Sequence, residues 1–519
     1  MISAKFFTML TFFIFSCGSS TSSHEEKIDF VQLPTLENRE EVKEEYLSSN
    51  SKESRWFSIA AVGEVRGEIE PCGCPTLPYG GFARRDMMLQ EMQPSFHVDV
   101  GEMLLKGFST KSHINSHERA KEIASLSKKV GVDVWSVGPS DVVALGVSTL
   151  QNIEGPPIIS ATYLDQNGEY LFEPFVVLET KNIRSSEDTK HISVAFVGFS
   201  ERIEDPIVQK QLNYLEPVVA WKNLIPKIPP HVDFIVGLSS ISDQKLQKLE
   251  AEISQSSLPI PLFISTRGEA YEKVKYPSKE EYPNKATIVE VPDRGRYVEK
   301  LILYLGSEKS IPPILLGSEQ KWRTFSENLT ISYQKQFKEF EDVGKGFNLL
   351  FTESVALNQT FEPRKKTKIV NQLATFRDAQ IKKAEEISKR SLEEYEVGYA
   401  AMGKCVRCHS QEMSKWSLTK HARAWETLIL RGEENNPECI ACHSTGYGQA
   451  GGFGELNETQ IRKYKSVQCE SCHGPMLSHP QNESVKPTEI NEDVCTSCHD
   501  EANSPKFEYT SYIRRATCQ

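Results

Sequence analysis

The stretch "VQCESCHGPMLSH", residues 467–479, contains two cysteines three positions apart, with a histidine directly after the second one. The same arrangement occurs four times in the C-terminal part of the chain. The four copies are Cys405, Cys408 and His409; Cys439, Cys442 and His443; Cys469, Cys472 and His473; and Cys495, Cys498 and His499. Disulfides and zinc sites are the usual uses of paired cysteines, and neither requires a histidine after every pair.

The repeated pattern is the attachment motif for c-type haem. The two thiols add to the vinyl groups of the haem as thioethers, and the adjacent imidazole then lies under the iron as its proximal ligand. Histidine makes up only 12 of the 519 residues, so four coincidental histidines are improbable. The sequence therefore predicts four covalently bound haem c groups, with the eight motif cysteines as thioethers and the four motif histidines as iron ligands.

Two further histidines of this region are candidates for the distal side of an iron. His479 follows His473 by six residues, which span at most about 20 Å when fully extended. Passing around the edge of the same haem would use nearly all of that length, so we expect His479 to coordinate a neighbouring haem. The same reasoning applies to His421, in "WSLTKHARAW".

The number of histidines limits the axial ligation. Residues 395–519 contain no histidine besides the four proximal ones, His421 and His479, so at most two haems can have two histidine ligands from this region. The other two need a histidine from elsewhere, an open sixth position at which small molecules bind, or another side chain. The candidate side chains are Met402, Met413, Met476 and Cys518.

The segments "GKCVRCHSQEMSKWSLTKHARAWETL", "NPECIACHSTGYG", "VQCESCHGPMLSH" and "VCTSCHDEANSPKFEY" resemble the tetrahaem cytochrome c-554 family over roughly residues 395–519. The resemblance implies a mostly helical, loop-rich domain whose closely stacked haems pass electrons one at a time. It also implies that His421 and His479 are distal ligands. Many relatives carry a further histidine near the place where this chain has Cys518. Few long apolar runs occur here, so the haems are expected to supply much of the core.

The N-terminal segment "MISAKFFTMLTFFIFSC" has a short apolar run after Lys5, which predicts a signal peptide over residues 1–16. Residues 14–17 resemble a bacterial lipobox, which implies acylation of Cys17 and attachment to a membrane through that lipid. A plain signal peptide with a nearby cleavage site is the alternative. Residues 17–54 are rich in Ser, then in Glu and Lys, and predict a flexible tether. We expect an exported protein, in the periplasm or at a cell-envelope membrane.

Residues 55–310 alternate short apolar runs with helical patterns, which predicts an α/β domain. The expected strands lie in "WFSIAAVGEV", "SFHVDVGEML", "VDVWSVGP", "PPIISATYL", "ISVAFVGFS", "VDFIVGLSS" and "PLFISTRG". The expected helices lie in "ARRDMMLQEMQ" and "HERAKEIASLSKKVG". A helical linker over residues 311–394 is expected to join this domain to the haem region, residues 395–519. The fold class is thus a multidomain chain with an α/β sandwich, a helical linker and a mostly-α multihaem c-type cytochrome domain.

The order of "GEVRGEIEPCGC", "VDVGEML", "VGVDVWSVGPSDVVALGVSTL" and "PPIISATYL" resembles the calcineurin-like metallophosphoesterase fold, in the branch that contains 5′-nucleotidases. Active members hold two metal ions with Asp and His. The matching positions here are occupied by other residues, namely Glu64, Arg66, Glu102, Pro139 and Ser140. The resemblance therefore implies a scaffold or docking module with a degenerate metal site.

Several residues have no place in these patterns. His97, His113 and His117 are expected to be surface or helix-face histidines, although one could reach across as a haem ligand. Cys72 and Cys74, in "EPCGCP", could form a disulfide, bind a metal or remain thiols.

We expect an electron carrier that exchanges electrons with redox proteins of the cell envelope and is assembled by haem maturation machinery. The net charge of −11 argues against a nucleic-acid partner. One alternative is a haem oxidoreductase that acts on a small nitrogen or oxygen species at an open-coordinate haem. Another is a metal-dependent phosphoesterase with attached haems. No catalytic residue is assigned.

Overall fold

The computed structural model describes most of the chain beyond residue 54. The described residues are 55–71, 78–104, 116–180, 191–256, 260, 262–266, 274–275, 286–292, 294–306, 312–315, 348–394, 398–482, 484–499, 504 and 506–516. Residues 55–519 form one compact unit. The predicted signal peptide, Cys17 and the tether lie outside the described residues, as do Cys72, Cys74, His113 and Cys518.

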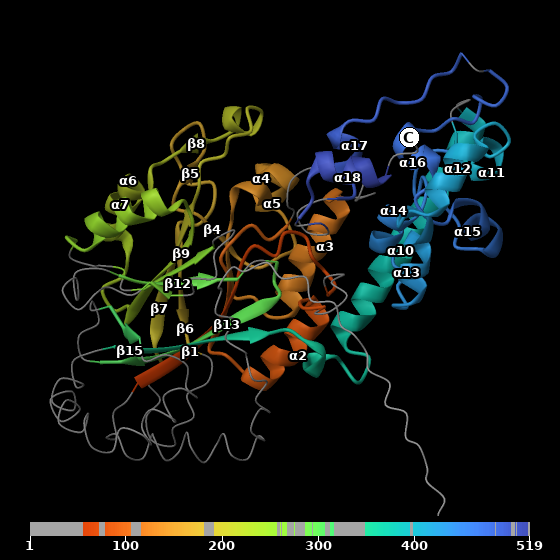
Figure 1. Ribbon diagram of the computed structural model, residues 1–519. Helices are drawn as coiled ribbons and strands as arrows, with labels where there is room; N and C mark the ends of the chain where they lie inside the picture. The colour runs from red at the N-terminus through yellow and green to blue at the C-terminus, as the bar shows by residue number, and fades with distance from the viewer. Residues whose placement is uncertain are drawn as a thin grey trace, which may run out of the picture. The chain divides into compact units, whose positions relative to one another are not determined.

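Two large β-sheets form the centre of the α/β part (Figure 1). The first has the strand order β14-β15-β13-β1-β2-β3-β4, and the second has the order β11-β12-β10-β9-β7-β6. The strands of the first sheet are β1 (Arg55–Val62), β2 (Phe96–Asp99), β3 (Val134–Ser136), β4 (Ile158–Ile159), β13 (Tyr297–Leu305), β14 (Ile314–Leu315) and β15 (Leu349–Ala356). Those of the second are β6 (Phe175–Glu179), β7 (Ser193–Ser200), β9 (Phe234–Ser240), β10 (Leu262–Thr266), β11 (Val274–Lys275) and β12 (Thr287–Val291). All seven predicted strands are confirmed.

The two sheets pack face to face. Strands β1 to β4 are parallel, as are β7, β9, β10 and β12. Parallel strands covered on both faces consist of nearly continuous apolar residues, which explains why their sequences were recognisable. Between the sheets, the ring of Phe57 lies 5.8 Å from that of Phe234, and Phe96 lies 5.3 Å from Phe196. These edge-on aromatic contacts join β1 and β2 to the second sheet.

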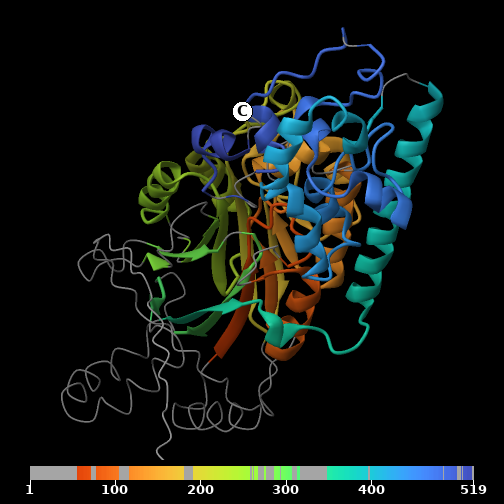
Figure 2. The same cartoon turned by 45° about the vertical axis from the view of Figure 1, so that its right-hand side comes forward.

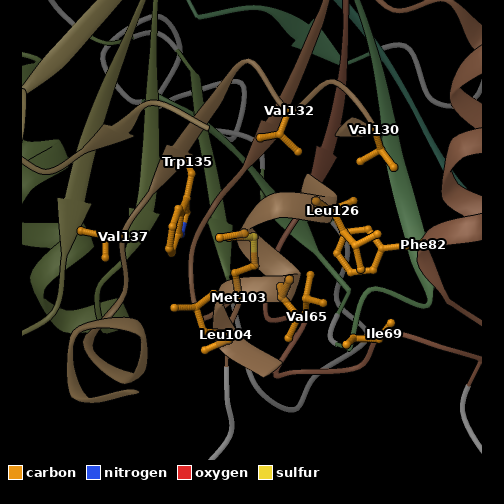
Figure 3. Close-up of a cluster of buried hydrophobic side chains, with 14 of the residues drawn as sticks. Val65, Ile69, Phe82, Met103, Leu104, Leu126, Val130, Val132, Trp135 and Val137 are labelled. Carbon is orange, nitrogen blue, oxygen red and sulfur yellow. The ribbon is translucent and has the colours of Figure 1, made fainter. Parts of the chain in front are cut away.

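Helices cover the outer face of each sheet. On the first sheet, α2 (Phe82–Met92) and α3 (Ser116–Lys129) enclose a core that includes Val65, Phe82 and Leu126 (Figure 3). On the second, α6 (Pro217–Leu224) and α7 (Asp243–Ile253) pack against β7 and β9. Both predicted helices of this part are confirmed. Shorter segments complete it: α4 (Pro139–Leu145), α5 (Val147–Gln151), β5 (Tyr163–Leu164) and β8 (Asn213–Tyr214).

The boundary expected at residue 310 is wrong. Strand β15 lies inside the segment expected to be a helical linker, and it pairs antiparallel with β13 from Tyr297↔Ala356 to Tyr304↔Leu349. Leu350 of β15 is fully buried between the sheets. The apolar run at the start of β15 is short and lies between long Lys- and Glu-rich segments. The helical periodicity of those segments therefore predicts a helix where the structure has a strand. The α/β part therefore extends past residue 356.

The long helix α10 (Lys368–Glu394) confirms the helical prediction for the last part of the expected linker (Figure 2). Its first half packs into the α/β core through Ile369 and Leu373, whereas Ala384 belongs to a core in the C-terminal region. The helix is thus a shared structural element of both parts. Within the described part of the chain, no helix is long and apolar enough to cross a membrane.

The C-terminal region is built from short helices and loops, as predicted. The helices are α11 (Met402–Cys405), α12 (Ser410–Ser417), η4 (His421–Arg423), α13 (Ala424–Ile429), α14 (Pro437–His443), α15 (Glu458–Tyr464), α16 (Cys469–His473), α17 (Glu492–Thr496) and α18 (Tyr509–Ala516). Their side-chain core is small and centres on Trp425, Phe453 and Tyr464. This agrees with the expectation that side chains alone fill little of this region.

Replacement of Leu350 tests whether β15 belongs to the folded sheet. Leu350→Ala should lower the free energy of unfolding of the α/β part by about 2–5 kcal/mol, because it opens a cavity between the two sheets. The measurement is urea denaturation followed by far-ultraviolet circular dichroism. The control Glu353→Ala, at a half-buried position of the same strand, should change that free energy by about 0.5 kcal/mol or less. Equal stability of both variants would contradict the assignment.

Candidate haem centres

The four haem motifs lie on or next to single helical turns. Helix α14 contains Cys439, Cys442 and His443, and α16 consists of residues Cys469–His473. Residues three and four positions apart share one face of a helix, so each motif presents two thiols and an imidazole on the same side. The side chain of Asn436 caps α14 by accepting a hydrogen bond from Glu438 N at 3.1 Å. None of the eight motif cysteines forms a disulfide, so all eight are chemically suited to thioether formation.

Hydrogen bonds at Nδ1 orient three of the imidazoles. His443 Nδ1 lies 2.8 Å from the carbonyl oxygen of Ala424, and His479 Nδ1 lies 3.0 Å from that of Val485. His499 Nδ1 lies 2.7 Å from Ser504 Oγ. A hydrogen bond at one ring nitrogen fixes the tautomer and leaves the other nitrogen available to a metal. The residues present therefore fit iron coordination through Nε2.

Two pairs of histidine rings lie close together. The ring centres of His409 and His479 are 6.4 Å apart with an interplanar angle of 27°, and those of His421 and His499 are 6.0 Å apart with an interplanar angle of 48°. Two metal–nitrogen bonds of about 2 Å, on opposite sides of one metal ion, place two imidazole ring centres roughly 6 Å apart. His479 thus lies opposite the proximal histidine of another motif, and so does His421. This geometry fits the predicted ligation, which remains a prediction.

The first cysteines of two motifs lie close together. The thiols of Cys405 and Cys469 interact by a hydrogen bond that raises the pKa of Cys405 and lowers that of Cys469 to about 7. The first and third motifs are therefore neighbours in space. Haems attached at these two cysteines would lie near each other, which electron transfer between them requires.

Large apolar side chains next to the haem motifs are exposed. Val406 lies inside the first motif, Leu418 precedes His421, and Leu477 precedes His479. Leu418 is 84% exposed. Single exposed apolar side chains are common on protein surfaces, so these three do not by themselves mark a binding site.

The residues predicted to occupy a degenerate metal site contact one another. Arg66 and Glu64 form an ion pair, and Glu102 accepts hydrogen bonds from the backbone N (3.2 Å) and the hydroxyl of Ser140. Glu64, Arg66 and Glu102 all have a positive φ, between 47° and 56°. Backbone bonds from Glu64 N to Gly101 O (2.7 Å) and from Arg66 N to Glu102 O (3.0 Å) hold this conformation. Among the described residues, no group of three or more His, Cys, Asp or Glu side chains could hold a metal ion.

The carboxyl groups at this edge of the sheet are buried. Burial raises the pKa of Glu102 to about 7, and the nearby Asp141 raises it further, whereas the hydrogen bonds from Ser140 lower it. Burial also raises the pKa of Asp141 to about 7, against the hydrogen bonds donated by Gly138 N and Leu104 N, both 2.8 Å. The charge of each carboxylate disfavours ionisation of the other, so the two groups are seldom ionised together at a pH well below 7.

Two of the histidines outside the haem region lie in described elements of the α/β part. His97 lies in β2 and is 2% exposed, so the expectation of a surface or helix-face histidine is wrong for it. His117 is exposed near the start of α3, as expected.

The sequence did not reveal the residues that join the α/β part to the second haem motif. Arg119 of α3 donates from Nε to Gly67 O at 2.8 Å and forms an ion pair with Glu438 of α14. Glu70 accepts from Arg377 Nη2 at 2.6 Å and from Asn436 Nδ2 at 3.1 Å. Except for Arg119 and Gly67, these partners are separated by more than 300 positions. No local pattern could have indicated them.

The comparisons with known proteins agree with the geometry of this region. Residues 404–474 match the family "Cytochrome c554 and c-prime". This c554-like segment contains the first three motifs and His421. Cytochrome c-554 from Nitrosomonas europaea is 32% identical to this chain over 87 residues, which cover 14% of this chain and 36% of that protein. The match thus spans about a third of the relative's length. The C-terminal region is similar to c-type cytochromes, which bind haem covalently.

Solved structures similar to this chain include calcineurin-like phosphoesterase YfkN from Bacillus subtilis. It is 15% identical, with 63% of this chain and 98% of that chain covered and a TM-score of 0.43. The 5′-nucleotidase precursor from Thermus thermophilus is 13% identical, with 73% and 68% covered and a TM-score of 0.41.

The raised pKa of Glu102 predicts how stability depends on pH. The folded state keeps a proton that the unfolded chain loses near its ordinary pKa of 4.5, so stability should fall as the pH rises from about 4.5 to about 7. Glu102→Gln keeps an acceptor for Ser140 and removes this titrating proton. The free energy of unfolding of this variant should therefore fall less over this pH range. The difference from the unsubstituted protein should be about 1.4 kcal/mol for each unit by which the pKa of Glu102 is raised. The measurement is urea denaturation at pH 5 and pH 8. The exposed Glu91→Gln should behave like the unsubstituted protein; an equal pH dependence in Glu102→Gln would contradict the prediction.

Proposed function

We propose that this protein is an exported tetrahaem c-type cytochrome that relays electrons between redox partners at the cell envelope. The observation that carries the proposal is the presence of two close histidine pairs, whose ring centres are 6.4 Å and 6.0 Å apart. Each pair consists of a proximal histidine and a histidine outside the motifs. An iron with six fixed ligands changes its charge without binding or releasing a substrate. That property suits an electron carrier.

The histidine pairs support a proposed ligation for two of the four haems. The first haem would be held by Cys405 and Cys408, with His409 and His479 as axial ligands. The fourth haem would be held by Cys495 and Cys498, with His499 and His421 as axial ligands. The contact between Cys405 and Cys469 supports transfer between the first and third haems, because it brings their attachment points together.

The second and third haems, bound through His443 and His473, have no histidine of residues 395–519 left for their sixth position. Met402, Met413, Met476 and Cys518 remain candidates. This count favours a second candidate function, in which one haem keeps an open position and oxidises or reduces a small nitrogen or oxygen species. The spin state of the irons separates the two functions, because a carrier should be wholly low-spin.

Export follows from the predicted signal peptide, and lipid attachment follows from the predicted acylation of Cys17. Attachment of haem c requires haem maturation machinery, and an exported location would bring the protein to partner redox proteins of the envelope. We propose a scaffold or docking role for the α/β part, because the Glu64–Arg66 pair occupies the start of the degenerate metal site.

Haem content and ligation can be tested on the full chain produced with haem maturation machinery. The pyridine haemochrome assay should give four haems per chain, and electron paramagnetic resonance should show at least two low-spin irons with two histidine ligands. His479→Ala should remove one of these low-spin signals, because the iron loses its sixth ligand, and should give one new high-spin signal. The exposed His117→Ala is the control and should leave the spectrum unchanged. Unchanged spectra in His479→Ala would contradict the ligation.

The phosphoesterase alternative predicts a different result. We expect no release of phosphate from 5′-nucleotides above the rate without protein, with Mn²⁺, Zn²⁺ or Mg²⁺ added. The double variant Arg66→His and Glu64→Asp introduces the residue types that active family members have at these two positions. Its rate of phosphate release is compared with that of the unsubstituted protein. Metal-dependent phosphate release by the unsubstituted protein would overturn the proposed scaffold role.

A further inference from the structure

The α/β part contacts the helix that carries the second haem motif. Arg119 is 6% exposed, and its guanidinium bridges the loop after β1, at Gly67 O, to Glu438 on the first turn of α14. A buried guanidinium needs such partners, because leaving it unpaired would cost several kcal/mol. The loop after β1 is thereby held against α14, one residue before Cys439.

A second set of contacts places charges at the N-terminus of α14. The carboxylate of Glu70 accepts from Arg377 Nη2 at 2.6 Å and from Asn436 Nδ2 at 3.1 Å. Asn436 is the residue that caps α14, and its Nδ2 also donates to Glu433 at 3.0 Å. The side chain of Glu70 is 19% exposed and that of Arg377 is 38% exposed, so solvent screens this pair only in part.

These charges act on the haem attachment point itself. Burial raises the pKa of the Cys439 thiol to about 12; Glu433 and Glu70 raise it further, whereas Arg377 and Arg431 lower it. The charges therefore lie close enough to change the electrostatic potential at the cysteine that would carry the second haem. A negative charge that disfavours a thiolate also disfavours the addition of an electron to a haem bound there.

We propose that Glu70 lowers and Arg377 raises the reduction potential of the haem held by Cys439, Cys442 and His443, so that the α/β part contributes two opposing charges to that redox centre. The inference rests on the proposed haem content. Glu70 comes from the loop after β1, and Arg377 comes from the helix shared by both cores. The two residues act through their charges, and these opposite charges nearly compensate each other in the unsubstituted protein.

The proposal gives effects of opposite sign for the two residues. Glu70→Gln leaves the Arg377 guanidinium uncompensated, which favours the reduced haem and raises its potential. Arg377→Gln leaves the Glu70 carboxylate uncompensated and lowers the potential. Each change should alter the equilibrium constant for reduction by about threefold to tenfold, which is about 30–59 mV for one electron. The double variant should return close to the original potential, because neither charge remains.

The experiment is a potentiometric titration of the full, haem-loaded chain, followed by visible absorption. His443→Met changes an axial ligand of the same haem and so marks which of the four steps belongs to it. If that variant does not fold, the titrations of the other three still show whether one step moves in opposite directions. The control Glu386→Gln removes an exposed carboxylate from the same helix as Arg377 and should shift no step.

The outcomes separate this inference from the proposed function. Opposite shifts of one step, with restoration in the double variant, support the inference. Fully loaded variants whose steps stay in place, or move in the same direction, overturn it and leave the carrier function intact. A chain that binds fewer than four haems under these conditions contradicts the proposed haem content, before any potential is compared.

Discussion

The C-terminal region depends on one geometric constraint, namely that two thiols and an imidazole must reach the same haem from one short piece of chain. A single helical turn satisfies this constraint, because residues three and four positions apart lie on one face. Helices α14 and α16 need be no longer than seven and five residues for this purpose. The short helices, the long loops and the small side-chain core around Phe453 are then consequences of a region built to hold macrocycles.

The parts of the structure that could be predicted from the sequence are those with local signals. The seven expected strands are continuous apolar runs, and the haem motifs carry their own spacing. Strand β15 was missed, because its apolar residues lie between long charged segments with helical periodicity. Chain length alone predicts that His479 binds a haem other than that of His473. The closeness of His479 to His409 depends on how distant segments fold together, and no local pattern indicates it. The contact between Arg119 and Glu438 joins residues 319 positions apart and has no sequence signature.

The loop after β1 contains both the Glu64–Arg66 ion pair and a residue that contacts the haem-motif helix α14. It begins at Glu64 and Arg66, which form an ion pair where the resemblance to metallophosphoesterases would place metal ligands. It also contains Glu70, which contacts the cap of the haem-motif helix. The same loop therefore carries an ion pair of its own and a contact with the cap of α14. Three residues with positive φ at this edge show that the loop is held by its backbone bonds.

Helix α10 has a consequence for how the protein could be divided. Its first half contributes Ile369 and Leu373 to one core, and its second half contributes Ala384 to the other. If the chain were divided before this helix, the α/β part would lose Ile369 and Leu373 from its core. If it were divided after the helix, the C-terminal region would lose Ala384 from its core. The boundary between the two parts thus falls inside a single helix, and neither part can be expressed alone with its core complete.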